Sequence, residues 1–206
     1  MSEIPVTFRS GELQLEGLMA SPTAASGAAV VCHPHPTYGG SMHNNVVEAV
    51  LDALWRRGYA TLRFNFRGVG ESEGEYDGGQ GEADDARAAV SFLAERAAVK
   101  AVTLAGYSFG ASVAMRAGLA DAAIDRVIAV ALPIAMTNSG VGGPAAKPVL
   151  LVSGDCDSYS PVDPLRALAL KLGDAAHLEI IGGADHFFGG DEPQLSAVIA
   201  GALGDR

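Results

Sequence analysis

Residues 102–120 decide the fold, and they read VTLAGYSFGASVAMRAGLA. The apolar run at 102–105 is typical of a buried strand, and the small residues at 111–117 favour a helix. Between them stands GYSFG at 106–110. Glycines on both sides of a serine suit a strained strand-to-helix turn, because a Cβ there would collide with neighbouring chain. The pattern predicts an elbow that lifts the Ser108 hydroxyl above the edge of a sheet.

Further apolar runs recur before and after this elbow. They are rich in β-branched residues and bounded by Gly, Pro or Asp, which suits a mainly parallel sheet that is buried on both faces. The predicted strands are Ala28 to Cys32, Ala60 to Phe66, Ala101 to Ala105, Val127 to Leu132, Val149 to Val152 and Leu178 to Ile181. Two earlier runs with apolar alternation predict an antiparallel N-terminal hairpin, Ile4 to Arg9 and Leu13 to Met19.

Helical periodicity fills most of the gaps between these strands. The predicted helices cover residues 46–55, 82–100, 108–119, 161–172 and 193–203. Strand followed by helix, repeated after a hairpin, predicts an α/β protein with an open, doubly wound sheet and helices on both faces. Such sheets bind ligands beyond the carboxyl ends of their strands. Because no internal repeat or low-complexity tract divides the chain, we expect one domain over residues 1–206.

Composition and charge exclude several classes of protein. Hydrophobic residues make up 49% and charged residues 18% of the 206 residues, so the chain is expected to fold. The net charge of −10 repels phosphate backbones, and nucleic acid is therefore not an expected partner.

The sequence also predicts where the protein resides and what it does not bind. Met1 to Gly17 contains no basic region followed by an apolar stretch, and the longest uncharged apolar run, Val127 to Met136, is too short to span a bilayer. We therefore expect a cytoplasmic protein with no membrane partner. Cys32 and Cys156 form no disulfide framework or metal-binding pattern, so no metal or other cofactor is expected. The sequence leaves open whether the chain forms a homo-oligomer.

A serine hydroxyl is a poor nucleophile unless a base takes its proton. His186 is the candidate base, because it follows the last predicted strand on a loop at the carboxyl end of the sheet. A carboxylate must then hold the imidazole, and the loop after residues 149–152 offers Asp155 and Asp157. We prefer Asp157, since Asp155 directly follows a glycine and suits an Asx-type bond that ties down its own turn.

Acyl transfer also needs N–H donors for the oxyanion that develops on the carbonyl oxygen. The first candidate is the backbone amide of Phe109, directly after the serine. The second is the amide of His35, because its neighbours Pro34 and Pro36 have no N–H. The alternative for this loop is a rigid proline turn with a satisfied histidine.

Taken together, these residues resemble the α/β-hydrolase superfamily, and within it the small, lidless serine hydrolases similar to dienelactone hydrolases and short carboxylesterases. The resemblance rests on five motifs in order: HPHP at 33–36 with GG at 39–40, RFNFRGVGES at 63–72, the elbow, residues 154–161, and DHFF at 185–188. The family's Gly-x-x-Asp-x-x-x-Pro pattern overlays Gly154, Asp157 and Pro161, which supports Asp157 as the acid. Pro34 stands where many relatives have the glycine of a His-Gly-x loop.

The resemblance has further implications for the site. Residues 133–148 are too few for the helical cap that many relatives insert, so we expect an open pocket. Arg67 and Ser72 are expected to position backbone rather than to react. Aromatic side chains near the strand ends are candidates for the pocket lining, namely Tyr38, Tyr107, Tyr159 and Phe187.

The resulting hypothesis is a serine hydrolase that cleaves carboxylic esters of small molecules with short or accessible acyl groups. Ser108 attacks, His186 moves the proton, Asp157 orients His186, and water hydrolyses an acyl-enzyme. Two alternatives remain open. One is a peptidase or amidase with the same chemistry, and the other is a binding protein that keeps a hydrolase scaffold without turnover.

Overall fold

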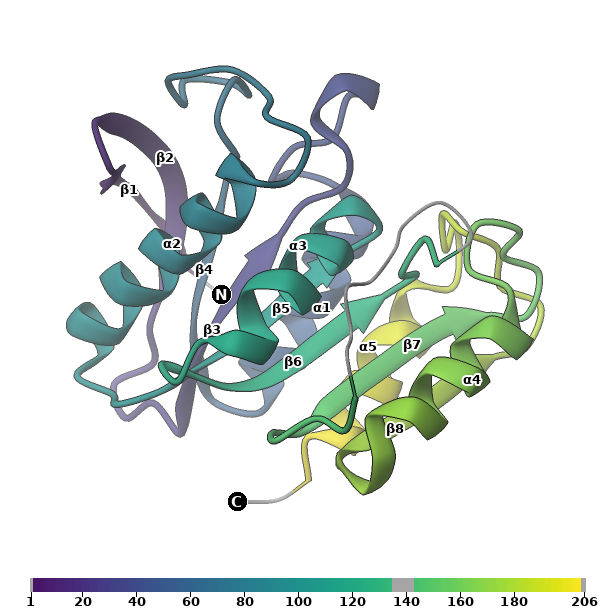
Figure 1. The fold of residues 1–206 in the computed structure, drawn as a ribbon. Helices are drawn as coiled ribbons and strands as arrows, with labels where there is room; N and C mark the ends of the chain where they lie inside the picture. Colours follow the sequence, from purple (N-terminus) through teal and green to yellow (C-terminus); the bar gives the residue numbers. More distant parts are fainter. Residues whose placement is uncertain (1, 135–142, 205–206) are drawn as a thin grey trace.

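One sheet organises the computed structural model, which describes residues 2–134 and 143–204 (Figure 1). Its strands are β1 (Ile4–Ser10), β2 (Leu13–Ala20), β3 (Gly27–Cys32), β4 (Tyr59–Phe64), β5 (Val102–Tyr107), β6 (Ile124–Val130), β7 (Val149–Gly154) and β8 (Ala176–Ile181). Among the described residues their spatial order is β1-β2-β4-β3-β5-β6-β7-β8. The strands β1 and β2 form an antiparallel hairpin, β2 joins β4 antiparallel, and all other pairs are parallel. The predicted hairpin and parallel sheet are confirmed.

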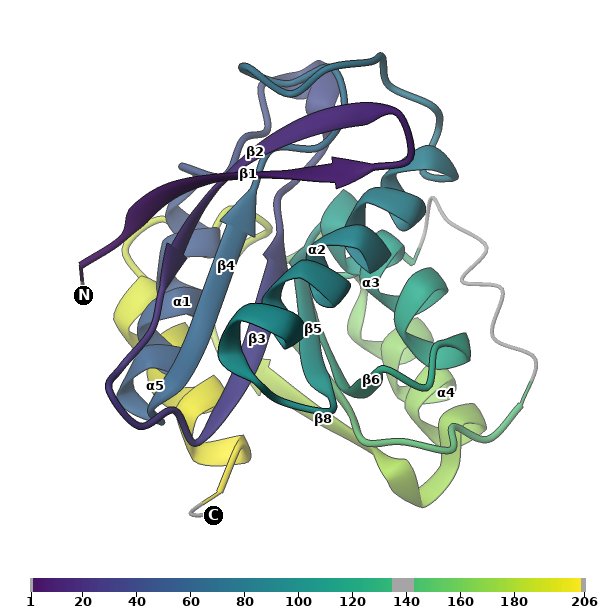
Figure 2. The same cartoon turned by 90° about the vertical axis from the view of Figure 1, so that its left-hand side faces the viewer.

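Five α-helices of the described residues cover both faces of this sheet. They are α1 (Asn45–Arg56), α2 (Gly81–Ala97), α3 (Phe109–Ala120), α4 (Val162–Leu172) and α5 (Glu192–Ala202). Figure 2 shows α1 and α5 on one face and α2, α3 and α4 on the other. The doubly wound α/β architecture predicted from the sequence is confirmed, and its parallel strands end at one edge of the sheet.

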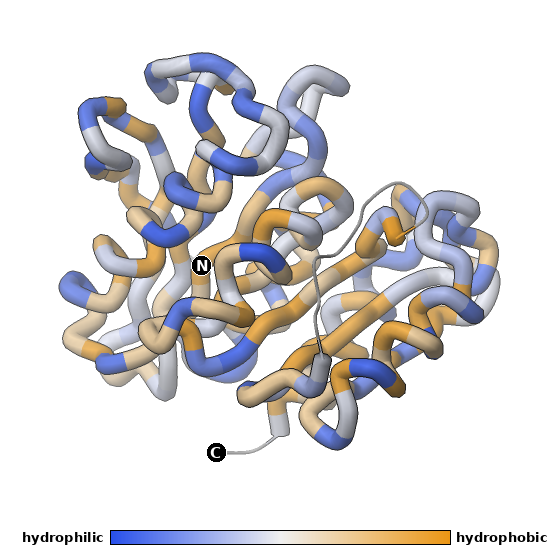
Figure 3. The backbone as a smooth tube through the Cα atoms, in the orientation of Figure 1, coloured by the Kyte–Doolittle hydropathy of each residue, from blue (hydrophilic) through white to orange (hydrophobic). Residues whose placement is uncertain are grey.

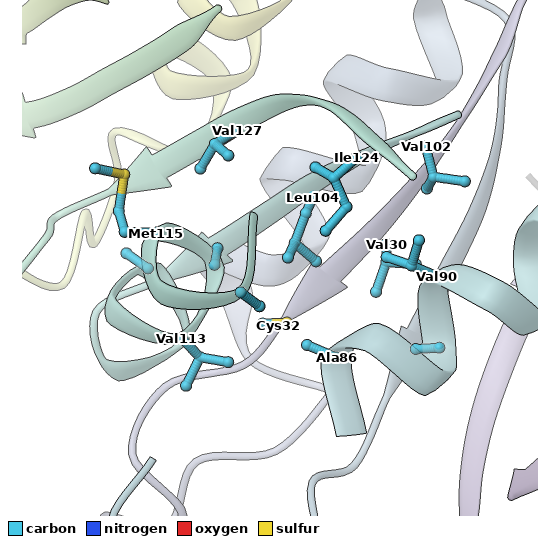
Figure 4. Packing of buried hydrophobic residues seen from close by; sticks show 14 of the residues in the cluster. Val30, Cys32, Ala86, Val90, Val102, Leu104, Val113, Met115, Ile124 and Val127 are labelled. Carbon is cyan, nitrogen blue, oxygen red and sulfur yellow. The ribbon is translucent and has the colours of Figure 1, made fainter. Parts of the chain in front are cut away.

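Alternating side chains of the strands pack into two apolar clusters, one on each face. Val30 and Leu104 belong to the cluster that also contains Val90 of α2 and Met115 of α3 (Figure 4). Their neighbours Val31 and Ala105 lie in the opposite cluster with α1 and α5. Successive residues of a strand face opposite sides, so a strand buried on both faces must be apolar throughout. In Figure 3 the central strands are accordingly coloured mostly as hydrophobic residues.

Several strand ends differ from the predicted ones by one to three residues, and two of these differences have a clear cause in the structure. The strand β6 begins at Ile124 rather than at Val127, because Ile124 and Arg126 already pair with β5 across an irregularity in the register. The strand β4 ends at Phe64 rather than at Phe66. The amide of Phe66 donates to the ring of His33 (3.0 Å) and so leaves the strand ladder.

Residues 135–142 lie outside the described residues. They belong to the 133–148 segment that the sequence predicts to be too short for a cap, and the last two residues of the apolar run that ends at Met136 lie among them. No helix of the described ranges is long and apolar enough to cross a membrane.

His33 links the ends of β3 and β4 in the interior. Its side chain is fully buried. The Nδ1 atom lies 2.6 Å from the carbonyl oxygen of Pro34, and Nε2 accepts from the Phe66 amide. These partners require one neutral tautomer, with the proton on Nδ1. Burial lowers the pKa of His33 from 6.5 to about 4, although the hydrogen bond to the Pro34 carbonyl favours the charged form.

This histidine makes folding stability depend on pH. Because its pKa is lower in the folded than in the unfolded chain, its contribution is complete above pH 6.5 and is lost as pH falls toward about 4. Over that window we expect the free energy of unfolding to fall by up to about 1.4 kcal/mol per pH unit from this group. Urea unfolding at several pH values measures this free energy, and its plot against pH should be less steep for His33→Gln than for the wild type between pH 6.5 and about 4. Equal steepness in the two proteins would contradict a lowered pKa for His33.

Candidate active site

The sharp turn between β5 and α3 carries Ser108. Its backbone is in the left-handed half of conformational space, with φ 54° and ψ −116°. Its amide donates to the carbonyl of Val130 (2.9 Å). A Cβ on Gly106 would overlap the carbonyl of Gly110, and a Cβ on Gly110 would overlap the carbonyls of Cys32 and His33. The two glycines therefore allow α3 to start directly above the end of β3, as the sequence pattern predicts.

Asp157 lies in the loop after β7, and its carboxylate is almost fully buried. Its Oδ1 atom accepts from the amides of Tyr159 (2.8 Å) and Ser160 (3.0 Å). Its Oδ2 atom lies 2.8 Å from Nδ1 of His186. These partners hold the carboxylate in one orientation, with one oxygen free for the histidine.

His186 lies in the loop after β8, between Asp157 and the elbow. Its Nε2 atom lies 3.0 Å from the Ser108 Oγ. Because Nδ1 faces a carboxylate, the proton of the neutral ring lies on Nδ1, and Nε2 accepts from the serine hydroxyl. The structure thus brings the three predicted side chains together in one hydrogen-bonded chain, although they come from the ends of three different strands.

Asp155 has another role than the one predicted. We expected it to tie down its own turn, but its Oδ1 atom accepts from the amide of Gly183 (2.7 Å), in the loop that leads to His186. The Asx-type bond in this turn belongs to Asp157, which accepts from an amide two residues on. Asp155 therefore joins the loops after β7 and β8, and it lies outside the chain that reaches Ser108.

Tyr107 holds the backbone of His186. Its side chain is 3% exposed, and its hydroxyl donates to the carbonyl oxygen of His186 (3.0 Å). Burial raises the pKa of Tyr107 strongly, and the nearby carboxylates of Asp157 and Asp185 raise it further, so the hydroxyl stays protonated. Tyr107 lies in the predicted pocket wall, but its polar atom serves the histidine loop.

Replacing Tyr107 with phenylalanine tests this role. The ring remains, and only the hydrogen bond to the His186 carbonyl is lost. We expect kcat to fall about 2- to 10-fold, the range that one neutral hydrogen bond supports. Steady-state kinetics should show KM changing less than kcat. An unchanged kcat would show that the hydroxyl does not help to position His186.

The amides of Phe109 and His35 border the same site. Phe109 is the first residue of α3, and His35 lies in the loop after β3. Neither amide donates to any residue of the described ranges. The His35 ring, by contrast, is hydrogen-bonded, and Pro36 opens a short 3-10 turn over Pro36–Tyr38. The sequence offered two alternatives for His35, a free backbone amide or a hydrogen-bonded side chain in a proline turn. The structure shows both features in this residue.

A cleft of about 640 Å³ opens over Ser108. Its lining includes the four predicted aromatic residues, Tyr38, Tyr107, Tyr159 and Phe187. Three of them form an exposed rim, with 84% of Tyr38, 43% of Tyr159 and 62% of Phe187 accessible to solvent.

Sequence reasoning missed four residues of this lining, namely Asn44, Tyr76, Gly78 and Pro133. Tyr76 comes from the polar, glycine-rich loop before α2, which carries no periodic pattern. Its one distinguishing feature in the sequence is that it is the only aromatic residue between Arg67 and Gln80.

The remaining sequence expectations concern residues near the site. Arg67 forms a two-pronged ion pair with the buried Asp85 (3.0 and 2.7 Å). The hydroxyl of Ser72 donates to the carbonyl of Asn65 (2.7 Å). Both side chains therefore position backbone and helix, as expected. Within the described part of the chain, no cluster of His, Cys, Asp or Glu side chains fits a metal ion.

Comparisons with known proteins agree with this geometry. A family model described as serine aminopeptidase, S33, matches residues 24–147. The uncharacterized protein RP471 of Rickettsia prowazekii (strain Madrid E) is 34% identical over 94% of this chain and 86% of its own length.

Two solved structures are similar over nearly the whole chain. An alpha-beta serine hydrolase homologue from Coxiella burnetii is 32% identical with a TM-score of 0.91, covering 99% of each chain. XC6422 from Xanthomonas campestris, a serine hydrolase without lid, is 30% identical with a TM-score of 0.87, covering 98% of this chain and 93% of its own. The chain is therefore a hydrolase of the α/β-hydrolase superfamily, and it belongs among the lidless members.

Proposed function

We propose that this chain is a serine hydrolase that cleaves carboxylic esters of small molecules. The observation that carries the proposal is the hydrogen-bonded chain from Ser108 through His186 to Asp157, which opens into the cleft. A nucleophile, a base and an orienting carboxylate in this order are what acyl transfer requires.

The first step forms a bond between Ser108 Oγ and the ester carbonyl carbon. His186 Nε2, 3.0 Å away, takes the hydroxyl proton as the bond forms. The resulting imidazolium is stabilised by Asp157, whose Oδ2 holds the Nδ1–H at 2.8 Å. Because Asp157 is already fixed by two backbone amides, little reorganisation accompanies the proton transfer.

The carbonyl oxygen gains negative charge in the same step. The amide of Phe109 lies at the N-terminus of α3, where the helix dipole favours an anion. The amide of His35 is the proposed second donor. Since neither amide has a partner among the described residues, both are available for the oxyanion.

The tetrahedral intermediate then collapses. The bond to the alcohol oxygen breaks, and His186 gives its proton to that oxygen. Water attacks the acyl-enzyme in the second half-reaction, with His186 taking the proton of the water and returning it to Ser108 Oγ. The alcohol and the carboxylic acid leave, and the enzyme returns to its starting state.

The cleft favours esters over the substrates of an aminopeptidase. An aminopeptidase has to bind a positively charged amino terminus, for which a carboxylate is the usual partner. Among the described residues, those that line the cleft include no Asp or Glu. A purely binding role has less support, because Ser108 keeps a strained backbone whose one clear benefit is to present a nucleophile.

A panel of chromogenic substrates tests the proposal. We expect turnover of para-nitrophenyl esters with a range of acyl groups, because the open cleft selects weakly by shape. Amino-acid para-nitroanilides should be cleaved far more slowly. A kcat/KM for these anilides above that for the esters would assign a peptidase instead, and no turnover of either class would favour a binding protein.

A further inference from the structure

The rings that line the cleft fall into two groups. One consists of His35, Tyr38, Tyr76 and Phe109, which we call the His35 ring cluster; its centroids are 4.6–5.7 Å apart in the contacting pairs. The other group surrounds His186 and consists of Tyr107, Tyr159 and Phe187. No ring contact within the described ranges joins the two groups. Ser108 connects them, since it bonds to His186 and directly precedes Phe109.

The proposed reaction distinguishes these groups. The alcohol oxygen has to lie within reach of His186 Nε2, which protonates it, so the alcohol half of an ester extends along the rings around His186. The acyl half is attached to the same carbon and has to leave it in another direction. The His35 ring cluster is the other group of rings that lines the cleft, and we take it as the side that receives the acyl half.

The hydrogen bonds of the His35 ring fix its tautomer. The backbone amide of Thr37, which can only donate, lies 3.3 Å from Nδ1, and the Thr37 hydroxyl lies 3.1 Å from the same atom. Nδ1 is therefore an acceptor, and the proton of the neutral ring is on Nε2. Burial lowers the pKa of His35, which favours this neutral form.

The tautomer sets the role of Tyr76. The Tyr76 hydroxyl lies 3.2 Å from His35 Nε2 and must accept the Nε2 proton. Its own proton is then free to be donated elsewhere. Tyr76 lines the cleft, and 39% of the residue is exposed to solvent. Burial and the nearby charge of Glu82 raise the pKa of Tyr76, so the hydroxyl keeps that proton.

The loop that carries Tyr76 is held in place by hydrogen bonds to a buried carboxylate. Glu82 is fully buried, and its carboxylate accepts from the amides of Asp77 (2.9 Å) and Gly79 (2.6 Å). Asp77 in turn accepts from the amide of Gly81 (3.1 Å). The hydroxyl of Tyr76 is therefore positioned before any ligand arrives, which lowers the entropy cost of binding.

We propose that the His35 ring cluster binds the acyl half of the substrate and that Tyr76 donates a hydrogen bond to an oxygen on it. The matching substrate class is an ester whose acyl half is a flat ring with an oxygen substituent. The ring packs against Phe109 and His35, and the oxygen accepts from Tyr76. This inference rests on the proposed esterase function, because that function assigns the two halves of the cleft.

Two esters of the same alcohol test it, para-nitrophenyl (4-methoxyphenyl)acetate and para-nitrophenyl (4-ethylphenyl)acetate. The acyl groups have nearly the same shape, only the methoxy group offers an oxygen, and the methylene insulates the ester from the ring. The readout is the ratio of the two kcat/KM values, in which general effects of a substitution cancel. We expect the wild type to prefer the methoxy ester about 2- to 10-fold.

Tyr76→Phe should lower this ratio to about one, because only the hydroxyl is lost. Tyr159→Phe, which removes a hydroxyl on the His186 side, should keep the wild-type ratio. A wild-type ratio near one, or a preference that survives in Tyr76→Phe, overturns the inference while ester turnover still supports the proposed function. A chain that cleaves neither ester and whose Ser108 fails to react with a fluorophosphonate overturns both.

Discussion

Ser108→Ala is expected to lower ester turnover about a million-fold, close to the loss seen when a serine nucleophile of this type is removed. Alanine has no Oγ to form the acyl-enzyme, and His186 has no hydroxyl to deprotonate. Serine and alanine both carry a Cβ, so the strain at φ 54° is the same in both chains. Steady-state kinetics with a para-nitrophenyl ester measures the loss, and urea unfolding checks that the variant folds.

Ser112 supplies the matched control. It lies one turn further along α3, and its buried hydroxyl has no partner among the described residues. Ser112→Ala should therefore keep wild-type turnover. If Ser108→Ala kept a tenth of the wild-type rate while folding normally, Ser108 would not be the nucleophile.

Asp157→Asn is expected to lower kcat about ten-thousand-fold, the loss known for the same change in a serine protease. The asparagine Oδ1 still accepts from the Tyr159 and Ser160 amides, so the loop keeps its shape. Its NH₂ group then faces His186 and donates to Nδ1. The imidazole proton moves to Nε2, where it blocks the transfer from Ser108. Steady-state kcat near neutral pH measures the effect.

Asp155→Asn is the matched control for this change. Its Oδ1 atom accepts from the Gly183 amide, and an asparagine oxygen accepts the same bond. We expect kcat within about tenfold of the wild type, since this bond acts on His186 only through the loop. The reverse ranking of the two variants would assign the orienting carboxylate to Asp155.

The sequence predicted the sheet well because burial on both faces demands unbroken apolar strands. Each predicted strand is present, and so is each helix that connects them. Strand ends were less predictable, because they depend on partners distant in the chain. Arg126 is polar and broke the apolar run, yet it pairs with β5, whereas the apolar Phe66 leaves its strand to bond with His33.

In the site, too, local motifs were predictable and contacts between distant residues were not. Ser108 follows from a local motif, and His186 from its place after the last strand. The roles of Tyr107 and Tyr76 depend on contacts with residues far along the chain, His186 and His35, which no local pattern contains. The bond from the Gly183 amide to Asp155, in place of the Asx-type bond expected of Asp155, likewise depends on where the loop after β8 passes.

Labelling with a fluorophosphonate probe tests the central claim most directly, since it requires no knowledge of the natural ester. The modified peptide is located by mass spectrometry, with Ser108→Ala as the control. We expect rapid labelling confined to Ser108 in the wild type and none at this position in the variant. A folded wild-type chain that is not labelled would contradict an activated nucleophile and favour a binding role for the cleft.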